Sequence, residues 1–316
     1  MTATLFSFQL TGCNTKGDEN NSDEDQLEIR SDGSYKLRIP LGGSLQNPAF
    51  SPDGQWILLT NFKNGYNQEP ADIIMFNLES RTLKTLVSDG SANVNLPGSC
   101  WNFLTRAIVF SSSRDPHDEI FWIGENGKPG DEVRITNRTK KMAYEPSLSP
   151  EGQTIVFESH LLDVEGNGVI VKYQLDGSAP YWDLTRATDD CRQPNWSPAN
   201  NLIVYQKGQS DQWDLWVMNP DGSGKRQITS GSGDKTDASF SPDAQWIIFS
   251  ANINPENANI FKISISGSGS AERITNFSGY DGAPSISPDG KKIAFESCPG
   301  DPDESSGTSI WMMERK

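Results

Sequence analysis

Ser51-Pro52-Asp53-Gly54 is a tetrapeptide that returns along the chain at nearly constant spacing. Its near-copies are Ser149-Pro150-Glu151-Gly152, Ser197-Pro198-Ala199-Asn200, Ser241-Pro242-Asp243-Ala244 and Ser287-Pro288-Asp289-Gly290. The last three intervals between these serines are 48, 44 and 46 residues, and the first interval, 98 residues, is about two such steps. A period of this length built from short strands indicates one supersecondary unit that is repeated around an axis.

The long first interval indicates a repeat whose tetrapeptide has been lost. In the clear repeats an apolar triplet begins six residues after the serine, as in Ile155-Val156-Phe157. The segment Ile108-Val109-Phe110 fits the same position and places the missing turn near Asn102. The chain therefore contains six repeats.

Each repeat is predicted to form four strands. The first strand ends just before the serine, where proline and glycine then favour a tight turn, and the apolar triplet forms the second strand. Two further β-branched or aromatic runs complete the repeat. This pattern predicts an all-β fold over residues 34–316, a six-bladed β-propeller with four-stranded blades. The segment from Tyr35 to Ile39 is expected to pair beside Ile310–Met313, to complete the last blade and to close the ring.

The repeated motif P-x-[FW]-S-P-D-G-x-x-[IL]-x-[FY] resembles the WD40-like (PD40) β-propeller repeat of TolB-type proteins. The resemblance covers about nine tenths of the chain and implies the propeller fold. In TolB itself a separate α/β domain precedes the propeller. Since the sequence has no counterpart of that domain, a stand-alone propeller is expected.

Composition limits the partners. The formal net charge is −15 and the sequence pI is about 4.6. Affinity for nucleic acid depends on lysine and arginine, so a nucleic-acid partner is not expected. The protein is expected to be a monomer.

The N-terminal segment resembles a bacterial lipoprotein signal. Leu10-Thr11-Gly12-Cys13 matches the lipobox pattern, which makes Cys13 the expected lipidation site and residues 1–13 the signal segment. Residues 14–33 are rich in acidic and polar side chains and are expected to form a disordered tether. We expect a periplasmic or cell-surface protein that contacts the membrane only through this lipid anchor, and Asn14 favours the outer membrane. The alternative is a chance match, because the segment lacks a basic start and its apolar stretch is short.

Residues with obvious catalytic or metal-binding patterns are scarce. The only histidines, His117 and His160, fall after second strands and are expected to be solvated loop residues. No G-x-S-x-G motif occurs, and Cys100, Cys191 and Cys298 lack the C-x-x-C spacing of zinc sites. No catalytic residue, cofactor or metal is predicted.

The mouth of the central channel is the expected functional surface. First strands lie innermost in a propeller, so residues four and five before each serine should surround one opening. The predicted ligand- or partner-binding residues at these positions are Asn47, Tyr144, Glu145, Arg192, Gln193 and Asp237. The incomplete repeat would contribute Pro97 and Gly98, and Asp281 is a further candidate. The alternative is that these side chains only satisfy backbone groups at the blade entrances. Glu158 and Glu296 are expected to bond between blades.

Two functions follow from this surface. The first is a non-enzymatic binding or scaffold propeller of the cell envelope that holds a protein or glycan partner at the channel mouth. The second is a carbohydrate-active, lyase-like enzyme that uses the carboxylates of Glu145 and Asp237, or a bound metal, for acid–base chemistry.

Overall fold

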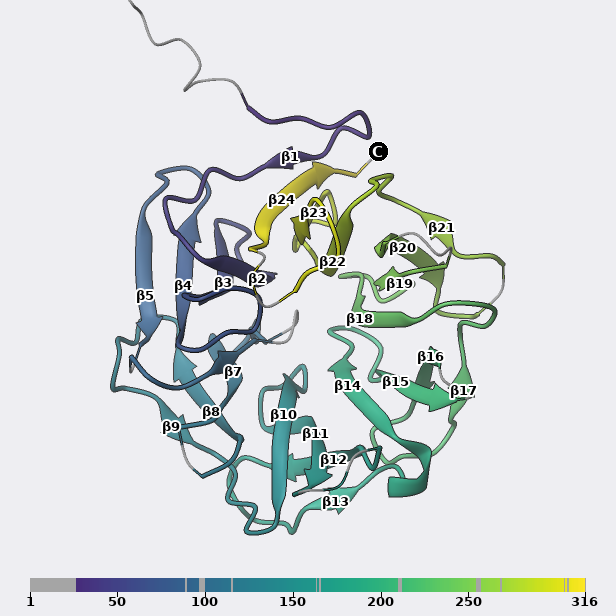
Figure 1. The fold of residues 1–316 in the computed structure, drawn as a ribbon. Coiled ribbons are helices and arrows are strands. Elements are labelled where there is room, and N and C mark those ends of the chain that lie inside the picture. The colour runs from purple at the N-terminus through teal and green to yellow at the C-terminus, as the bar shows by residue number, and fades with distance from the viewer. Residues whose placement is uncertain are drawn as a thin grey trace, which may run out of the picture.

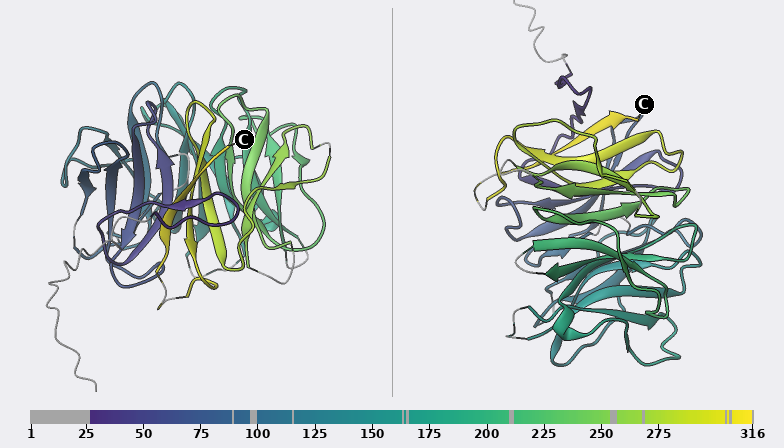
Figure 2. Two further views of the ribbon diagram at one scale, coloured as in Figure 1. Left: turned by 90° about the horizontal axis from the view of Figure 1, so that it is seen from above. Right: turned by 90° about the vertical axis from the view of Figure 1, so that its right-hand side faces the viewer.

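Six antiparallel sheets are arranged in a ring (Figure 1). The computed structural model describes residues 27–315, apart from residues 89, 97–99, 115, 163, 165, 210–211, 254–256, 268, 304 and 306. Each sheet has four strands, and the described part of the chain contains no α-helix. Viewed from the side, the ring is a thick disc with its sheets stacked around the axis (Figure 2). The prediction of a six-bladed, all-β propeller is therefore confirmed.

The first three blades follow one another in chain order, each from its innermost to its outermost strand. The strands of the first blade are β2 (Ser44–Phe50), β3 (Trp56–Phe62), β4 (Ala71–Asn77) and β5 (Leu83–Val87). Those of the second are β6 (Val94–Asn95), β7 (Ala107–Ser112), β8 (Glu119–Gly124) and β9 (Val133–Arg134). Those of the third are β10 (Lys141–Leu148), β11 (Thr154–Leu161), β12 (Val169–Gln174) and β13 (Trp182–Asp183).

The remaining blades repeat this order, except that the last one takes its outer strand from the start of the chain. The fourth blade holds β14 (Cys191–Trp196), β15 (Ile203–Gln209), β16 (Gln212–Met218) and β17 (Arg226–Gln227). The fifth holds β18 (Lys235–Phe240), β19 (Trp246–Ala251), β20 (Asn259–Ser264) and β21 (Glu272–Arg273). The sixth holds β22 (Tyr280–Ile286), β23 (Lys292–Cys298), β24 (Ser309–Glu314) and β1 (Tyr35–Lys36).

The repeated tetrapeptide forms the turn between the first two strands of a blade. In the first blade the Ser51 hydroxyl donates to Asp53 Oδ1 at 2.5 Å and accepts from the Trp56 backbone N–H at 2.9 Å. The backbone N–H of Gly54 donates to the Ser51 carbonyl at 2.8 Å, and Gly54 has a φ of 72°. Serine and aspartate therefore satisfy the turn's polar groups, and glycine supplies the left-handed conformation.

The incomplete second repeat makes the same turn with a different residue. Asn102 Oδ1 accepts from the backbone N–H groups of Leu104 and Thr105, at 2.9 and 2.8 Å. Its Nδ2 donates to the Ser149 carbonyl of the next blade at 2.9 Å. One asparagine thus replaces the Ser–Asp pair, which confirms the predicted position of the missing turn.

The apolar triplets form the centre of each sheet. The triplets of the first three blades, and Ile203, Val204, Ile247, Ile248 and Phe249, are fully buried. Adjacent sheets pack their faces together, so each triplet loses contact with water on both sides. Burial of a large apolar side chain contributes about 1.5–3 kcal/mol, which makes these contacts between blades the main stabilising term of the ring.

A β-bulge occurs at the same position in the innermost strands of five blades, and in the second blade the equivalent position lies outside the described residues. The register shifts at each bulge, and the residue four before the repeat serine adopts a left-handed φ, between 45° at Ala283 and 52° at Asp237. In four of these strands the next residue is proline, which a bulge tolerates because the ladder is already interrupted. The bulge turns its side chain toward the channel, and it is the local structure that builds the functional site.

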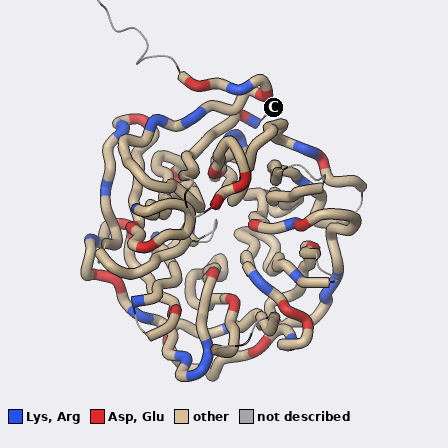
Figure 3. Tube along the Cα trace, in the orientation of Figure 1, with Lys and Arg blue, Asp and Glu red and all other residues tan. Residues whose placement is uncertain are grey.

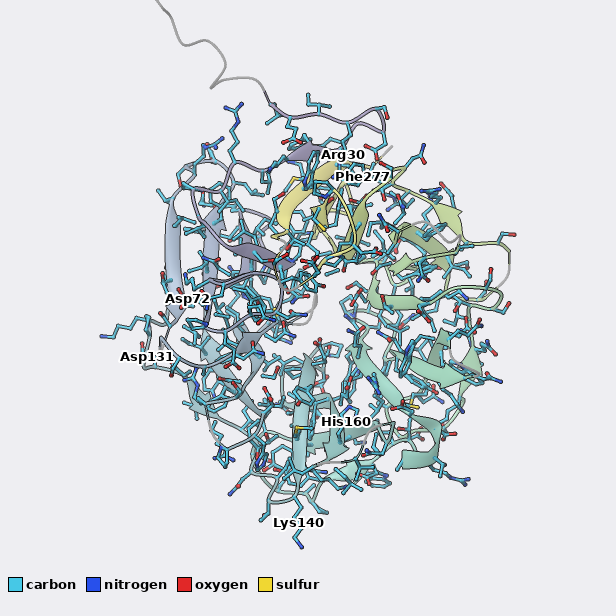
Figure 4. The ribbon with its side chains drawn as sticks, in the orientation of Figure 1. Arg30, Asp72, Asp131, Lys140, His160 and Phe277 are labelled. Carbon is cyan, nitrogen blue, oxygen red and sulfur yellow. The ribbon has the colours of Figure 1, made fainter. Side chains whose placement is uncertain are left out.

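The described chain begins earlier than the predicted propeller boundary. Residues 27–33, which we expected to belong to the tether, pack against the sixth blade. The Arg30 guanidinium lies between the rings of Phe277 and Trp311, 3.5 and 3.6 Å from their centroids, and pairs with buried Asp281 at 2.8 Å (Figure 4). From there Tyr35 and Lys36 pair with β24. The tether prediction is therefore wrong for residues 27–33, because Arg30 finds a buried partner, and residues 1–26 lie outside the described residues.

Candidate functional site

One end of the channel opens into a cavity of about 530 Å³, here called the mouth cavity. All six predicted site residues line it, and they come from the innermost strands β2, β10, β14 and β18. Further lining residues are Gln46, Tyr66, Asn67, Asn95, Glu158, Gln206, Trp213, Thr236, Tyr280, Ala283 and Glu296. The rotational repeat therefore brings side chains that lie far apart in the sequence to one polar opening.

Hydrogen bonds connect the wall of this cavity from the sixth blade to the third. Glu296 Oε2 accepts from the Asn47 backbone N–H at 2.9 Å. Asn47 Nδ2 donates to Asn95 Oδ1 at 2.7 Å, and Asn95 Nδ2 donates to Glu145 Oε1 at 3.1 Å. Each bond joins neighbouring blades, so the side chains are held in place before any ligand arrives.

A second run of bonds connects the third blade to the fifth. Glu158 Oε2 accepts from the Gln193 backbone N–H at 2.8 Å. Gln193 Oε1 accepts from the Asp237 backbone N–H at 3.0 Å, and Ser250 donates to Asp237 Oδ2 at 2.5 Å. Together with the Glu296–Asn47 bond, this confirms that Glu158 and Glu296 bond between blades. Of the predicted site residues, Gln193 therefore also satisfies the backbone N–H group of a bulge residue, Asp237.

Arg192 gives the wall its basic element. Its guanidinium pairs with Asp190 at 3.2 Å and lies over the Trp213 ring at 4.7 Å. The side chain is about a third exposed. Because the aspartate and the ring fix its plane, Arg192 presents its remaining N–H groups in one direction.

Two of the four carboxyl groups that line the cavity have raised pKa values. Burial, followed by the nearby charges of Glu158, Asp237 and Glu296, raises the pKa of Glu145 to about 8. Burial also raises the pKa of Glu296 to about 7, although the Asn47 N–H bond opposes this shift. Around the channel opening acidic segments predominate, whereas most basic segments lie on the outer rim (Figure 3). The cavity thus favours a ligand that brings positive charge or hydrogen-bond donors.

Two tyrosines close one side of the cavity. The hydroxyls of Tyr66 and Tyr280 both donate to Glu296 Oε1, at 3.2 and 3.1 Å, and the two rings meet edge to face. Burial and the charge of Glu296 raise the pKa of each tyrosine above its ordinary value. Both rings remain neutral and offer an amphipathic surface to a ligand.

Some expectations about the channel differ from the structure. Asp281 does not line the mouth cavity: it is fully buried and pairs with Arg30. Pro97 and Gly98 lie outside the described residues. His160 is not a solvated loop residue, because it belongs to β11, is buried and bonds Glu158 through Nε2 (Figure 4). His117 is largely buried too, with Nε2 2.7 Å from the Arg138 carbonyl.

The count back from each repeat serine did not place several of the lining residues in the cavity. Asn95 lies seven residues before Asn102, so counting four and five residues back from the repeat position could not reach it. Gln206 and Glu296 occupy the ninth position after the repeat serine, a second periodic signal that could have predicted them. Tyr66 comes from the loop between β3 and β4, for which the repeat offers no signal.

The described residues give no direct sign of a resident metal or a membrane span. Among them, no three histidine, cysteine, aspartate or glutamate side chains group in a way that could hold a metal ion. Within residues 27–315 and their gaps, no helix has the length and hydrophobicity needed to cross a membrane.

Known proteins with similar sequences and structures carry the same repeat. The family description "TolB beta propeller domain" (PD40) matches residues 28–213 and 183–304. The Tol-Pal system protein TolB of Francisella tularensis subsp. holarctica is 28% identical over 182 residues, which are 55% of this chain and 40% of that protein. The chain thus spans less than half the length of this relative.

Solved structures share the fold at low sequence identity. TolB from Acinetobacter baumannii superposes with a TM-score of 0.65 and 15% identity, covering 84% of this chain and 65% of that one. Oligogalacturonate lyase from Vibrio parahaemolyticus gives a TM-score of 0.59 and 14% identity, covering 92% and 96% of the two chains. These likenesses show the fold alone. With its repeats, blades and family match together, the chain belongs to the TolB beta propeller domain family.

Proposed function

We propose that this propeller is a non-enzymatic binding module of the cell envelope that holds a protein or glycan partner in the mouth cavity. The observation that carries the proposal is the convergence of six polar residues from four blades on one cavity of about 530 Å³. Hydrogen bonds between residues of different blades also fix the positions of Asn47, Glu145, Gln193 and Asp237 in this wall. A rigid, preformed surface loses little conformational entropy on binding.

The chemistry of the wall supports a polar partner. Glu145 and Asp237 offer acceptors, Arg192 offers donors, and Trp213 and Tyr66 offer rings for a sugar face or an apolar side chain. The relatives named Tol-Pal system protein TolB support an envelope protein as the partner. We propose that the propeller acts as a monomer.

A lipid anchor at Cys13 would place this module at the envelope surface. The support is the Leu10–Cys13 motif and the polar stretch that follows it. We propose a periplasmic or cell-surface location, with the outer membrane favoured by Asn14. The test compares membrane and soluble fractions of cells that express the full chain or its Cys13→Ala variant. Equal partition of the two forms would contradict the anchor.

Partner capture tests the binding function. The immobilised chain is incubated with a detergent extract of envelope from cells that express it, and with a glycan array, and bound material is quantified. Arg192→Ala combined with Asp237→Asn should reduce recovery at least about tenfold, because both side chains face the cavity. The matched control, Lys225→Ala with Asp221→Asn on the exposed outer hairpin of the fourth blade, should leave recovery unchanged. Equal loss in both pairs, or no specific recovery by the unaltered chain, would refute the proposal.

The second candidate, a carbohydrate-active lyase, is favoured by one observation. Glu145 and Glu296 have pKa values near 8 and 7, close to those that suit a general acid or base at neutral pH. Oligogalacturonate incubated with the chain, with and without added manganese, would yield unsaturated products that absorb in the ultraviolet. Turnover that disappears in the Glu145→Gln variant would establish the enzyme in place of the binding module.

A further inference from the structure

A second cavity, of about 500 Å³, lies at the opposite end of the channel from the mouth cavity. The innermost strands all run in the same direction, and the mouth cavity is lined by their earlier residues, up to the bulge. The second cavity is lined by their last two residues and by the prolines that follow, for example Trp196 and Pro198. Between the two the channel narrows to a space of about 30 Å³, room for a single water molecule.

The wall of this second cavity, here called the apolar cavity, is made of large apolar side chains. The residue just before each repeat serine points there, so the motif that builds the turn also builds the wall. Its main side chains are Phe50, Trp101, Leu148, Trp196, Phe240 and Ile286. A concave apolar surface of this size is what a small ligand or an anchoring side chain of a partner occupies.

Two exposed apolar residues extend the wall toward solvent. Phe103 and Leu104 belong to the turn of the second blade, line the apolar cavity and are 49% and 73% exposed. In the other repeats this turn is polar, with Asp53 or Asp243 in it. Exposed large apolar residues beside an apolar cavity indicate an interaction surface, because burying them against a partner lowers the free energy.

The rim around the apolar cavity is acidic. Exposed carboxylates stand next to the lining prolines at Glu151, Asp243 and Asp289. Glu151 and Asp243 form no ion pair with another described residue, and Lys291 approaches Asp289 only at 3.8 Å. With a net charge of −15 on the whole chain, this rim attracts a partner that carries lysine or arginine.

The acidic rim favours a peptide with basic residues over a fatty acid, because a fatty acid brings a carboxylate of the same sign as the rim.

We propose that the apolar cavity is a second docking site, for a protein segment that inserts large apolar side chains and carries basic residues beside them. The propeller then holds one partner at each end of its channel and acts as a bridge between them. This goes beyond binding at the mouth cavity, because the two sites use different ends of the same strands.

Three fluorescent peptides of about a dozen residues test the site. One has a Leu-Phe core flanked by lysines, the second has the same core flanked by glutamates, and the third has a serine core flanked by lysines. The first should bind the purified chain at least about tenfold more tightly than either of the others. Its affinity should also fall as salt is added, because the rim contribution is screened.

Variants locate the binding. Leu104→Glu should weaken the first peptide at least about tenfold, since it puts a charge at the cavity edge. The matched control is Val133→Glu, at an apolar residue of β9 that is 50% exposed and does not line the cavity, and it should change the affinity less than about twofold. Arg192→Ala with Asp237→Asn should leave this peptide's affinity intact, which separates this site from the mouth cavity.

Several results would overturn the proposal. Equal binding of the three peptides would do so, as would equal loss in the Leu104→Glu and Val133→Glu variants. A dimer detected by light scattering and dissolved by Leu104→Glu would identify a second copy of the chain as the occupant. A fluorescent fatty acid that binds the cavity when the first peptide does not would identify a lipid.

Discussion

At the scale of single residues, the repeat depends on a few backbone conformations that most side chains avoid. Glycine occupies the left-handed position of the turn in three repeats, with φ near 70°, whereas Ala244 adopts a φ of 51° in the fifth. At the bulges the left-handed residues are Asn47, Glu145, Gln193, Asp237 and Ala283. The strain there is the cost of presenting these side chains to the channel.

Two turn glycines separate the cost of a positive φ from the cost of a steric clash with an added Cβ atom. A Cβ on Gly54 would approach nothing closer than 3.6 Å, whereas one on Gly152 would lie 2.6 Å from Thr105 Cγ2. Gly54→Ala should therefore cost about 1 kcal/mol of unfolding free energy, from its positive φ alone. Gly152→Ala should cost at least twice that amount, since it adds a clash with the second blade. Urea unfolding of both variants measures the difference, and equal costs would contradict it.

At the scale of the strand, threonine links the third and fourth strands of several blades. In the fourth blade Thr229 Oγ1 accepts from the Leu215 backbone N–H at 2.8 Å and donates to buried Asp214 at 2.9 Å. Thr136, Thr185 and Thr275 accept from the equivalent N–H groups of their blades. The hydroxyl extends the sheet where the fourth strand is only two residues long.

Removal of one such hydroxyl should weaken its blade. Thr229→Val leaves the Leu215 N–H and an Asp214 oxygen without this partner, and should cost about 1–3 kcal/mol of unfolding free energy. Thr229→Ser keeps the hydroxyl and should cost clearly less. Chemical denaturation compares the two, and a valine variant as stable as the serine variant would show that the bonds contribute nothing.

The segment before the first blade forms its main side-chain contacts through Arg30. Burial raises the pKa of Asp281, and the Arg30 guanidinium opposes that shift. Arg30→Met would leave the fully buried Asp281 without its charge partner and should cost about 3 kcal/mol. It should also expose residues 27–36 to limited proteolysis.

A surface pair in the same segment is the control for Arg30. Lys36 lies 3.6 Å from Glu28, and both side chains are largely exposed. Lys36→Met should therefore cost less than about 1 kcal/mol. If the two substitutions were equally costly, the cation–π sandwich and the buried pair would not be what holds this segment.

At the scale of the whole molecule, the crowded carboxyls of the channel make stability depend on pH. Glu145 and Glu296 have pKa values of about 8 and 7 in the folded ring, against an ordinary value of 4.5. The folded state then binds more protons than the unfolded chain between pH 4.5 and pH 8. The contribution of these two groups to the free energy of unfolding is therefore fully present below pH 4.5 and declines as the pH rises toward 8.

The Glu145→Gln variant should reduce this dependence of the unfolding free energy on pH. Because the amide is never charged, the variant should be more stable than the unaltered chain at pH 8.5 and lose that advantage near pH 5. Urea midpoints at pH 5.5, 7.0 and 8.5 measure the difference. A variant that loses stability at high pH as steeply as the unaltered chain would show that Glu145 ionises freely.

The repeat made most of the fold predictable from the sequence. Short apolar triplets at one spacing can be buried only if like sheets pack face to face, so the number of serine-proline turns, with Asn102 in place of one, gave the number of blades. The innermost strands follow from the same spacing, and their repetition around an axis brings Asn47, Glu145 and Asp237 to one opening. These signals are local, and they recur often enough to be recognised without knowledge of the contacts between repeats.

Only the tertiary structure decided what each side chain touches across a blade boundary. Asn95 completes the wall from a blade whose motif has been lost, and Tyr66 reaches it from a loop of no fixed pattern. Arg30 was expected to lie in the tether, but its guanidinium packs between the rings of Phe277 and Trp311, which come together in the folded sixth blade. Such contacts depend on distances between strands far apart in the chain, and the sequence carries those distances only through the folded ring.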